Sequence, residues 1–239
     1  MKNTMPKQSQ VPAENLLLAA LPGPDRRRVL AACEQVDLLP GDVLYEPGER
    51  IRHVYFPTDS VISLITPMSG HDRLEVGQVG SEGMLGLSLV LGVNAARTLA
   101  LVQGAGAAWK LDTERFRHEL EHCDPLRRAL QRYVHVVMHQ LAQMAVCTRF
   151  HVVEARLARS LLMTRDRTNS NQFHVTHERL AQNLGVRRAG VTRAASALQT
   201  RKLISYSRGD ITILDRRGLQ GAACTCYAVD REAYANVMA

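Results

Sequence analysis

The side chains best suited to chemistry lie in the basic C-terminal part of the chain, between residues 176 and 208. Arg188 and Arg193 are the candidates for reading bases, because an arginine can donate two parallel hydrogen bonds to O6 and N7 of guanine, a contact worth about 1 to 3 kcal/mol of discrimination. The same segment holds further groups suited to phosphate oxygens: Thr176, His177, Arg187 and Arg208. Phosphate contacts fix the register of a protein on DNA without reading its sequence.

Residues 177–195 have the pattern of a helix-turn-helix, an element that would present these groups together. The apolar residues fall where the two helices would contact each other: Leu180, Leu184, Val186, Val191 and Ala194. Ala181 permits a close crossing, and Gly185 permits the turn. Thr176 is placed to cap the first helix, although Arg179 stands where a capping box would have Glu.

The second helix of this motif should project Arg187, Arg188, Thr192 and Arg193 outward, with no acidic residue among them. A pair of helices at this spacing can also be a plain core element, but a solvated face rarely needs three arginines without any acid. We therefore predict that this helix enters the major groove of DNA. Two copies of the chain would read half-sites about 34 Å apart, which predicts a palindromic operator.

The distribution of charge agrees with a nucleic-acid partner. The chain has 239 residues, of which 46% are hydrophobic and 22% charged, so disorder over most of its length is excluded. Residues 1–150 carry 16 Lys+Arg and 16 Asp+Glu, whereas residues 151–239 carry 14 and 7. The net charge of +7 therefore lies entirely in the last 89 residues. A neutral part followed by a basic part is expected when one module binds a polyanion, although a solvated basic surface would give the same count.

The cysteines and histidines give weaker signals. Five scattered cysteines make a disulfide framework improbable. Cys224 and Cys226 form a single C-x-C with no second pair of ligands nearby in the sequence, and His135 and His139 form only a two-ligand pair, so we expect no metal site. The chain has no run of 18 apolar residues and its N-terminus is polar. We expect a soluble, cytoplasmic protein.

The predicted elements begin with a polar, disordered lead over residues 1–13. Two short helices follow, separated by a break at residues 22–24. Short β-rich runs follow, punctuated by glycine and proline, which is typical of an antiparallel barrel, roll or sandwich. The runs cover residues 43–45, 54–56, 61–65, 74–76, 99–102 and 107–109.

A long helix is predicted over residues 124–150, because Asp124 and Pro125 can start it and neither Gly nor Pro recurs before Gly185. Its apolar residues repeat with spacings of four and three: Leu130, Val134, Val137, Leu141, Met144 and Thr148. This is the seam of a two-stranded coiled coil. We therefore predict a homodimer formed through this helix, the alternative being a helix packed only on its own barrel.

The remaining order is helix, strand, two helices and a hairpin around residues 208–210, which is that of a winged helix. The predicted fold class is α+β, with an antiparallel β-roll sensor domain (15–123), a dimerisation helix (124–150), a winged helix-turn-helix DNA-binding domain (151–217) and a C-terminal tail (218–239). Two alternatives stay open for the tail, which either folds back on the wing or stays mobile.

Together these elements resemble the CRP/FNR family of bacterial transcription regulators over roughly residues 15–215. The most specific pieces are residues 40–49 (PGDVLYEPGE) with 54–56 (VYF), residues 154–162 (EARLARSLL) and the helix-turn-helix. The resemblance implies a cyclic-nucleotide-binding-like sensor, a double-stranded DNA operator, a second copy of the chain and RNA polymerase as partners. Arg188 is followed by Ala189 where the family usually has Glu, so the half-site should differ from that of cyclic-AMP receptors.

The resemblance also implies an effector site formed by Gly83, Gly86, Leu87, Arg97 and Thr98. Its arginine would pair with a cyclic phosphate, but Met84 stands where the family places a ribose-binding carboxylate. Glu82 would need a shifted turn to replace it. In the long helix, Leu141 and Ala142 occupy the purine-contacting positions and lack hydroxyls. A site missing two sets of hydrogen-bond partners should lose several kcal/mol for cyclic AMP.

The resemblance raises two other cofactors. No cysteine cluster occurs near the N-terminus, so we expect no iron–sulfur cluster. Haem needs one or two axial ligands, and these histidines could provide them: His53, His71, His135 and His139.

The sequence thus predicts a DNA-binding transcription regulator, not an enzyme, with a degenerate effector site not specific for cyclic AMP. The alternatives left open are a regulator that responds to cyclic nucleotides, an interaction module that binds cyclic nucleotides but not DNA, and a haem or metal sensor acting as a redox switch.

Overall fold

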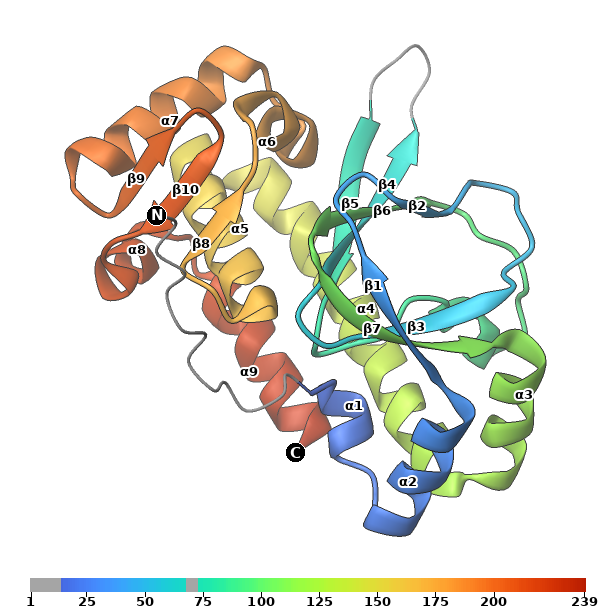
Figure 1. The fold of residues 1–239 in the computed structure, drawn as a ribbon. Coiled ribbons are helices and arrows are strands. Elements are labelled where there is room, and N and C mark those ends of the chain that lie inside the picture. Colours follow the sequence, from blue (N-terminus) through green and yellow to red (C-terminus); the bar gives the residue numbers. More distant parts are fainter. Residues whose placement is uncertain (1–13, 68–72) are drawn as a thin grey trace, which may run out of the picture.

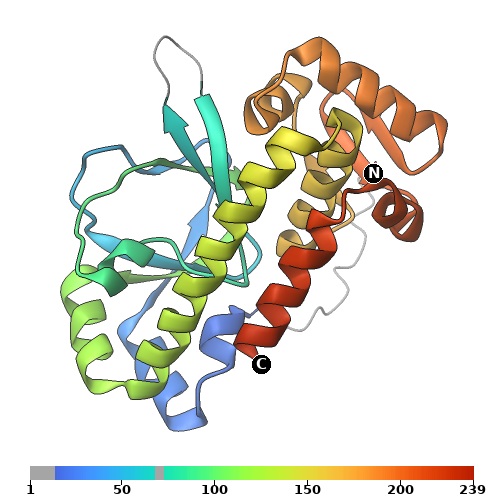
Figure 2. The same ribbon diagram turned by 180° about the vertical axis from the view of Figure 1, so that it is seen from behind.

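A computed structural model describes residues 14–67 and 73–239 of the chain (Figure 1). The predicted lead over residues 1–13 and His71 lie outside the described residues. The strand-rich N-terminal part lies beside a C-terminal part that is mainly helical, and one long helix runs between them (Figures 1 and 2). The predicted α+β class, with an antiparallel roll, a long helix and a C-terminal helix-turn-helix, is confirmed.

The described strands of the N-terminal part form two antiparallel sheets, in the orders β1-β7-β3 and β2-β6-β4-β5. Their bounds are β1 Glu34–Leu38, β2 Val43–Tyr45, β3 His53–Pro57, β4 Val61–Pro67, β5 Arg73–Val79, β6 Leu99–Gly104 and β7 Gly106–Asp112. Strand β3 shows why the sheets enclose a core, since Val54 and Phe56 are fully buried while the alternating residues His53 and Tyr55 are half-buried. Each predicted β-run corresponds to one of these strands, and β1 was not predicted.

Short helices close the ends of the roll: α1 Leu16–Ala19, α2 Gly23–Ala32, η1 Leu87–Leu91 and α3 Thr113–His122. Residues 20–22 separate the first two, close to the break that the sequence predicted. Asn15 caps α1 by accepting hydrogen bonds from two backbone N–H groups. Its amide nitrogen also donates to Pro57 O (2.9 Å) and Gly83 O (2.7 Å), which fixes α1 against the loop after β5.

Helix α4 spans Asp124–Phe150, the bounds predicted for the dimerisation helix. The predicted seam is only partly correct, because Leu130 is fully buried in the roll core, together with Leu126 and Tyr133. The larger apolar residues that α4 leaves half or fully exposed are Val134, Val137, Met138, Leu141, Met144, Val146 and Phe150, and Ala142 and Ala145 are exposed as well. The four-three spacing therefore persists on a rotated stripe through Val134, Met138, Leu141 and Ala145.

The C-terminal part is a winged helix-turn-helix. Its elements are α5 Val153–Thr168, β8 Gln172–His174, α6 His177–Leu184, α7 Arg188–Thr200, β9 Ile204–Ser207 and β10 Asp210–Ile213. The strands pair antiparallel in the order β8-β10-β9. A separate core holds these elements together, with Leu157, Val191 and Leu198 at its fully buried centre.

The predicted C-terminal tail forms two helices, α8 Arg216–Ala222 and α9 Cys226–Met238. Helix α9 packs along α4, and the two lie side by side in Figure 2. Helix α9 therefore folds back on the long helix, while Leu219 and Tyr227 of the tail belong to the core that also contains the wing strands. Asp230 on α9 binds Arg159 on α5 at 2.5 Å, and the Tyr234 hydroxyl donates to Glu82 O at 3.0 Å. Helix α9 thus contacts the roll, the long helix and the winged helix-turn-helix domain.

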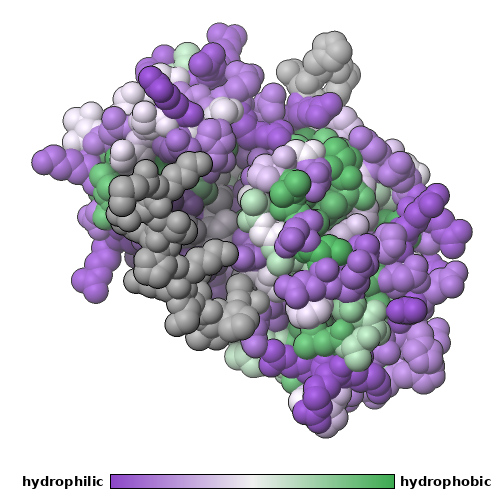
Figure 3. All heavy atoms as spheres, in the orientation of Figure 1, coloured by the Kyte–Doolittle hydropathy of each residue, from purple (hydrophilic) through white to green (hydrophobic). Residues whose placement is uncertain are grey.

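Hydrophilic side chains cover most of the C-terminal part in Figure 3, whereas apolar side chains gather on the visible face of the roll. None of the helices in the described part of the chain is long and apolar enough to cross a bilayer.

Candidate nucleic-acid interface and sensor cavity

The two ends of α6 explain why this sequence turns sharply before α7. Thr176 caps α6, since its hydroxyl accepts from the Arg179 N–H at 3.2 Å, as the sequence predicted. At the other end Gly185 has φ of 60°. Its N–H donates to Gln182 O (3.2 Å) and the next N–H, of Val186, donates to Ala181 O (3.0 Å). This is a Schellman motif, which satisfies carbonyls that the helix end would otherwise leave unpaired.

Helix α7 has one buried and one exposed face. Val191, Ala194 and Leu198 pack into the domain core, so the residues between them are turned toward solvent. The exposed residues of the first two turns are Arg188, Ala189, Thr192, Arg193 and Ser196. The structure therefore brings Arg188, Thr192 and Arg193 onto one outward surface, with Arg187 at the N-cap beside them.

The arginines of this surface have no acidic partner. Within residues 14–67 and 73–239, no carboxylate lies within ion-pairing distance of Arg187, Arg188, Arg193 or Arg208. An arginine without a carboxylate keeps its N–H donors available for phosphate oxygens or guanine edges. The surface can therefore bind a polyanion without first breaking internal contacts.

His177 lies at the start of α6, where its ring stacks on Tyr206 of the wing with ring centroids 4.2 Å apart. Its Nδ1 also forms a hydrogen bond with the Thr192 hydroxyl at 3.1 Å. Burial, and then the charge of Arg188, lower the pKa of the imidazole, so the ring is held neutral at pH 7. In this arrangement His177 positions Thr192 and the wing, and its contact with a phosphate stays a prediction.

The wing turn places Arg208 at the tip of the hairpin. Arg208 and Gly209 have φ values of 51° and 94°, as the two central residues of a type I′ turn require. A Cβ on Gly209 would lie 2.5 Å from the ring of His174, so glycine is needed here for space as well as for conformation. Arg208 is exposed, on the same domain as α7.

A cavity of about 260 Å³ lies between the roll, α4, α5 and α6. Of the predicted effector residues, Gly86, Leu87 and Thr98 line it, whereas Gly83 and Arg97 do not. The Arg97 side chain is exposed. Gly83 packs against α4 so closely that a Cβ there would lie 1.8 Å from Oη of Tyr133. Met84, in the position of the family's carboxylate, is 1% exposed and belongs to the roll core.

Glu82 does not replace that carboxylate. Its side chain forms an ion pair with Arg167 of α5 at 2.8 Å, and both side chains are largely buried. The acid that does line the cavity is Glu75 on β5, which sequence analysis missed. Ser63 donates a short hydrogen bond to it, and Gln78 Nε2 donates at 3.1 Å. Burial raises the pKa of Glu75 to about 7. Its only sequence signal is one charge between the apolar Leu74 and Val76 of a strand.

Of the two positions expected to face a purine, Leu141 lines the cavity and Ala142 is exposed. The cavity wall is otherwise supplied on α4 by Tyr133, Val137 and Met144 among others. The cavity also reaches Asn183 and Leu184 at the end of α6. A molecule in this cavity would therefore touch both the sensor and the helix-turn-helix.

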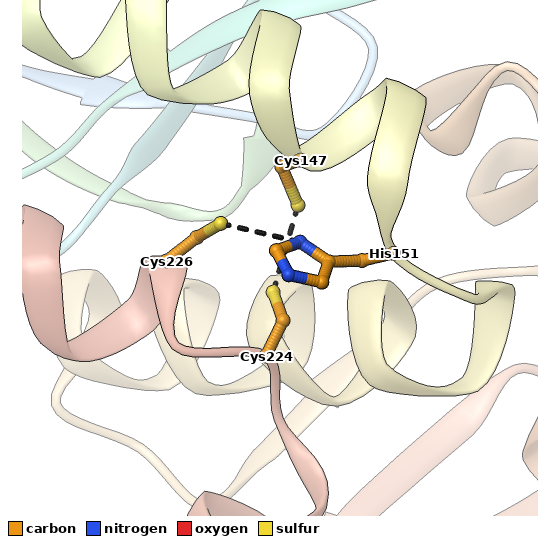
Figure 4. Close-up of side chains that lie close together, drawn as sticks. All are labelled: Cys147, His151, Cys224 and Cys226. Atoms are coloured by element: carbon orange, nitrogen blue, oxygen red, sulfur yellow. Dashed lines mark hydrogen bonds between the residues drawn. The ribbon is translucent and has the colours of Figure 1, made fainter.

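Four side chains that could bind a metal meet at the end of α4: Cys147, His151, Cys224 and Cys226 (Figure 4). Cys147 Sγ lies 3.5 Å from Cys224 Sγ, and Cys226 Sγ lies 3.4 Å from His151 Nδ1. A hydrogen bond from Cys224 lowers the pKa of the Cys147 thiol to about 5, and His151 and Arg159 act in the same direction.

The sequence analysis noted Cys224 and Cys226 but predicted no metal site, because no second pair of ligands lies nearby in the sequence. The fold supplies such a pair, Cys147 and His151, from about 75 positions earlier. A spacing of four between Cys147 and His151 on one helix was the only available signal. The predicted haem ligands that lie in the described residues, His53, His135 and His139, are not part of this cluster.

Comparison with known proteins adds the family to this geometry. Residues 155–222 match the family model of the Crp-like helix-turn-helix domain. No curated protein sequence matches the chain. The structure is similar to that of FixK2 from Bradyrhizobium japonicum, with 14% identity, coverage of 80% of this chain and 98% of that chain, and a TM-score of 0.68.

Two further structures match in the same way. The c-di-GMP responsive global regulator CLP from Xanthomonas campestris has 17% identity, coverage of 80% and 99% and a TM-score of 0.64. A putative transcriptional regulator of the Crp/Fnr family from Eubacterium rectale has 17% identity, coverage of 87% and 99% and a TM-score of 0.65. At these identities the likeness establishes the fold, and with the family match it confirms the predicted resemblance.

Proposed function

We propose that this chain, which has the fold of the CRP/FNR regulators and a Crp-like helix-turn-helix domain, is a sequence-specific, DNA-binding transcription regulator that acts as a homodimer on a palindromic operator. The observation that carries the proposal is the outward face of α7, where Arg188 and Arg193 stand free of any described carboxylate. In this proposal both arginines read base edges in the major groove. Thr176, His177, Arg187 and Arg208 contact phosphates, and RNA polymerase is the further partner.

Dimerisation rests on α4. The stripe through Val134, Met138, Leu141 and Ala145 is apolar and has the spacing of a coiled-coil seam. Met138 is 64% and Leu141 47% exposed in the single chain. Burying such side chains against a second copy would stabilise the dimer by about 1.5 to 3 kcal/mol each. Two DNA-binding domains would then be held at one fixed separation.

The effector of this regulator is not cyclic AMP in our proposal. Met84 is buried where a ribose-binding carboxylate would be needed, Glu82 is engaged by Arg167, and Arg97 does not reach the cavity. Calorimetry with cyclic AMP and cyclic GMP should therefore detect no tight binding. Tight binding that disappears in Arg97→Ala would overturn this part of the proposal.

The test of DNA binding begins with selection of an operator from random duplexes by the wild-type protein. Gel shifts at two salt concentrations then compare it with Arg188→Ala/Arg193→Ala. We expect the double variant to lose at least about 100-fold in operator affinity, because each guanine contact is worth about 1 to 3 kcal/mol. It should remain a dimer in sedimentation, since neither side chain touches α4.

The matched control is Arg50→Ala/Arg52→Ala, which removes the same charge from exposed positions on the roll. Its operator affinity should stay within a few-fold of the wild type. An unchanged affinity in the α7 double variant would show that the site is assigned wrongly, and equal losses in both double variants would reduce α7 to a non-specific basic surface.

A further inference from the structure

The side-chain cluster at the end of α4 joins two segments that are far apart in the sequence, residues 147–151 and 224–226. Cys147 lies in the last turn of α4, and His151 is the residue that ends the helix, with its N–H donating to Cys147 O. Cys226 is the first residue of α9, Thr225 is its N-cap, and Cys224 precedes Thr225. Ala155 of α5 packs against the three sulfurs. The cluster therefore sits where the long helix passes into the DNA-binding domain.

The distances fit one ion and not a disulfide or a larger cluster. The four potential ligand atoms all lie within 4.8 Å of one another. Ligands about 2.3 Å from a tetrahedral Zn²⁺ are about 3.8 Å apart, close to the 3.5 Å between Cys147 Sγ and Cys224 Sγ and the 3.4 Å between Cys226 Sγ and His151 Nδ1. Bonded sulfurs would be about 2.05 Å apart.

The surroundings also suit a bound cation. Cys147, Cys224 and Cys226 are buried, with exposures of 1%, 8% and 0%, so three thiols are gathered out of water. Gln143 Nε2 donates to Cys226 Sγ at 3.0 Å, a contact that orients a sulfur ligand. Three thiolates, one neutral imidazole and one divalent cation would carry one net negative charge.

We propose that Cys147, His151, Cys224 and Cys226 bind one Zn²⁺ ion in a closed tetrahedral site that fixes the C-terminal end of α4 to the start of α9. Three sulfurs and one imidazole nitrogen are a donor set that zinc prefers, and four protein ligands leave no open coordination position. The site is thus structural in form, and its ion can be lost by chelation or by oxidation of the cysteines.

The position of the site gives it a regulatory consequence, which rests on the proposed DNA-binding function. His151 and Val152 are the link between α4 and α5, so the ion holds the segment through which the dimer helix orients α6 and α7. Loss of zinc frees this link and the α8–α9 connection without touching α7. Operator affinity should therefore fall when the ion is removed, although no DNA-contacting residue has changed.

The experiment measures metal in the full-length protein purified under reducing conditions after expression with added zinc. We expect one zinc per chain, and X-ray absorption should show three sulfurs at about 2.3 Å and one nitrogen at about 2.0 to 2.1 Å. Co²⁺ added to the chelated protein should give the absorption of tetrahedral cobalt with thiolate ligands. Cys226→Ser should lose the zinc, whereas Cys33→Ser, at a half-buried cysteine outside the cluster, should keep it.

Because Cys226→Ser could fail to fold, Gln143→Ala provides a second variant. It keeps all four ligands and should weaken zinc binding by about 10- to 100-fold in competition with a chelator. Three results would overturn the proposal. The wild-type protein could contain no metal and a Cys147–Cys224 disulfide, or it could show the absorption spectrum of an iron–sulfur cluster. Alternatively, both Cys226→Ser and Gln143→Ala could retain zinc at full stoichiometry and affinity.

Operator binding is measured separately, so that the two proposals fail separately. One zinc per chain, with no operator binding by either the zinc-loaded or the chelated protein, would support the metal site and refute the proposed function. Operator affinity that is equal before and after chelation, with zinc shown to leave, would refute the regulatory consequence. A fall of at least tenfold that zinc reverses is the expected result.

Discussion

Helices α5 and α7 belong to the same domain and are both rich in arginine, but their arginines have opposite surroundings. Arg156, Arg159 and Arg167 of α5 are 8%, 5% and 6% exposed. Each contacts a different part of the chain: Leu184 O at the helix-turn-helix turn, Asp230 of the tail and Glu82 of the roll. Arg188 and Arg193 of α7 are exposed and have no described acidic partner.

The difference follows from the cost of removing a charge from water. A buried guanidinium must be paired and hydrogen-bonded, because an unpaired buried ion costs several kcal/mol. An exposed one keeps its hydration, and its binding to a phosphate releases counterions from the DNA. The net charge of +7 in the C-terminal part is therefore not all available to DNA. Part of the basic residue content joins the domains, and in the proposed function the exposed face of α7 supplies the contacts to DNA.

The largest expected effect is on α5. Asp230→Ala should leave Arg159 buried without its partner and destabilise the protein by about 3 to 5 kcal/mol. Glu154→Ala is the matched control, since Glu154 pairs with Arg201 at 2.9 Å but both side chains are substantially exposed, and such pairs contribute about 0 to 1 kcal/mol. Urea denaturation of both variants makes the comparison. Equal losses in the free energy of unfolding would mean that burial of the arginine does not determine how much its ion pair contributes to stability.

The parts of this fold that could be predicted from sequence are those whose signals are local. Thr176 and Gly185 specify the start and end of α6 within ten residues, and the predicted cap at Thr176 and turn at Gly185 are both present. The start of α4 near Pro125 and the turn at Arg208 and Gly209 are equally local. In each case the residues that determine the geometry are neighbours in the chain, so one short pattern is sufficient.

The rest depends on which distant segments meet. The predicted coiled-coil seam included Leu130, which packs into the roll core instead. Spacing alone does not tell which stripe of a helix faces its own domain. Glu75 is a cavity residue only because α4 and α6 pack against β5. Cys147 meets Cys224 only because α9 packs along α4. No local pattern contains these contacts.

A smaller effect is expected at Glu75, an acid near arginines that do not pair with it. Burial raises its pKa from 4.5 to about 7, and Ser63, Arg167, Gln78 and Arg179 only partly oppose that shift. Between these pH values the folded protein retains a proton that the unfolded chain has lost. Stability should therefore fall as the pH rises from 4.5 to about 7, and then stay level.

Glu75→Gln tests this, because the amide keeps an oxygen for Ser63 and cannot ionise. The variant should be more stable than the wild type by about 3 kcal/mol above pH 7, at about 1.4 kcal/mol per pH unit, and the advantage should vanish near pH 4.5. Unfolding is measured in urea across that range. Glu178→Gln, at an exposed position on α6, should show no such trend, and a flat difference for Glu75→Gln would mean that its carboxyl is ionised in the fold.

The smallest expected effect is at the wing, where Arg208 should bind one phosphate per subunit. Arg208→Ala should lower the slope of log affinity against log salt by about 0.9 for each phosphate that is no longer neutralised, which is about 2 for a dimer. Arg208 has a φ of 51°, and alanine at this position would have a similar conformational energy in the left-handed region. The free energy of unfolding should therefore not change. Because a phosphate carries no sequence information, affinity should fall equally for the selected operator and for base-substituted duplexes.

Arg188→Ala should instead reduce discrimination at one base position of each half-site, because its guanidinium is proposed to read a base edge. Gel shifts with the same set of duplexes compare the two single variants. Arg208→Ala could instead change discrimination between duplexes and leave the salt slope unchanged. The wing would then read bases, and the exposed arginines of this domain would not divide into base-reading residues on α7 and a phosphate-binding residue on the wing.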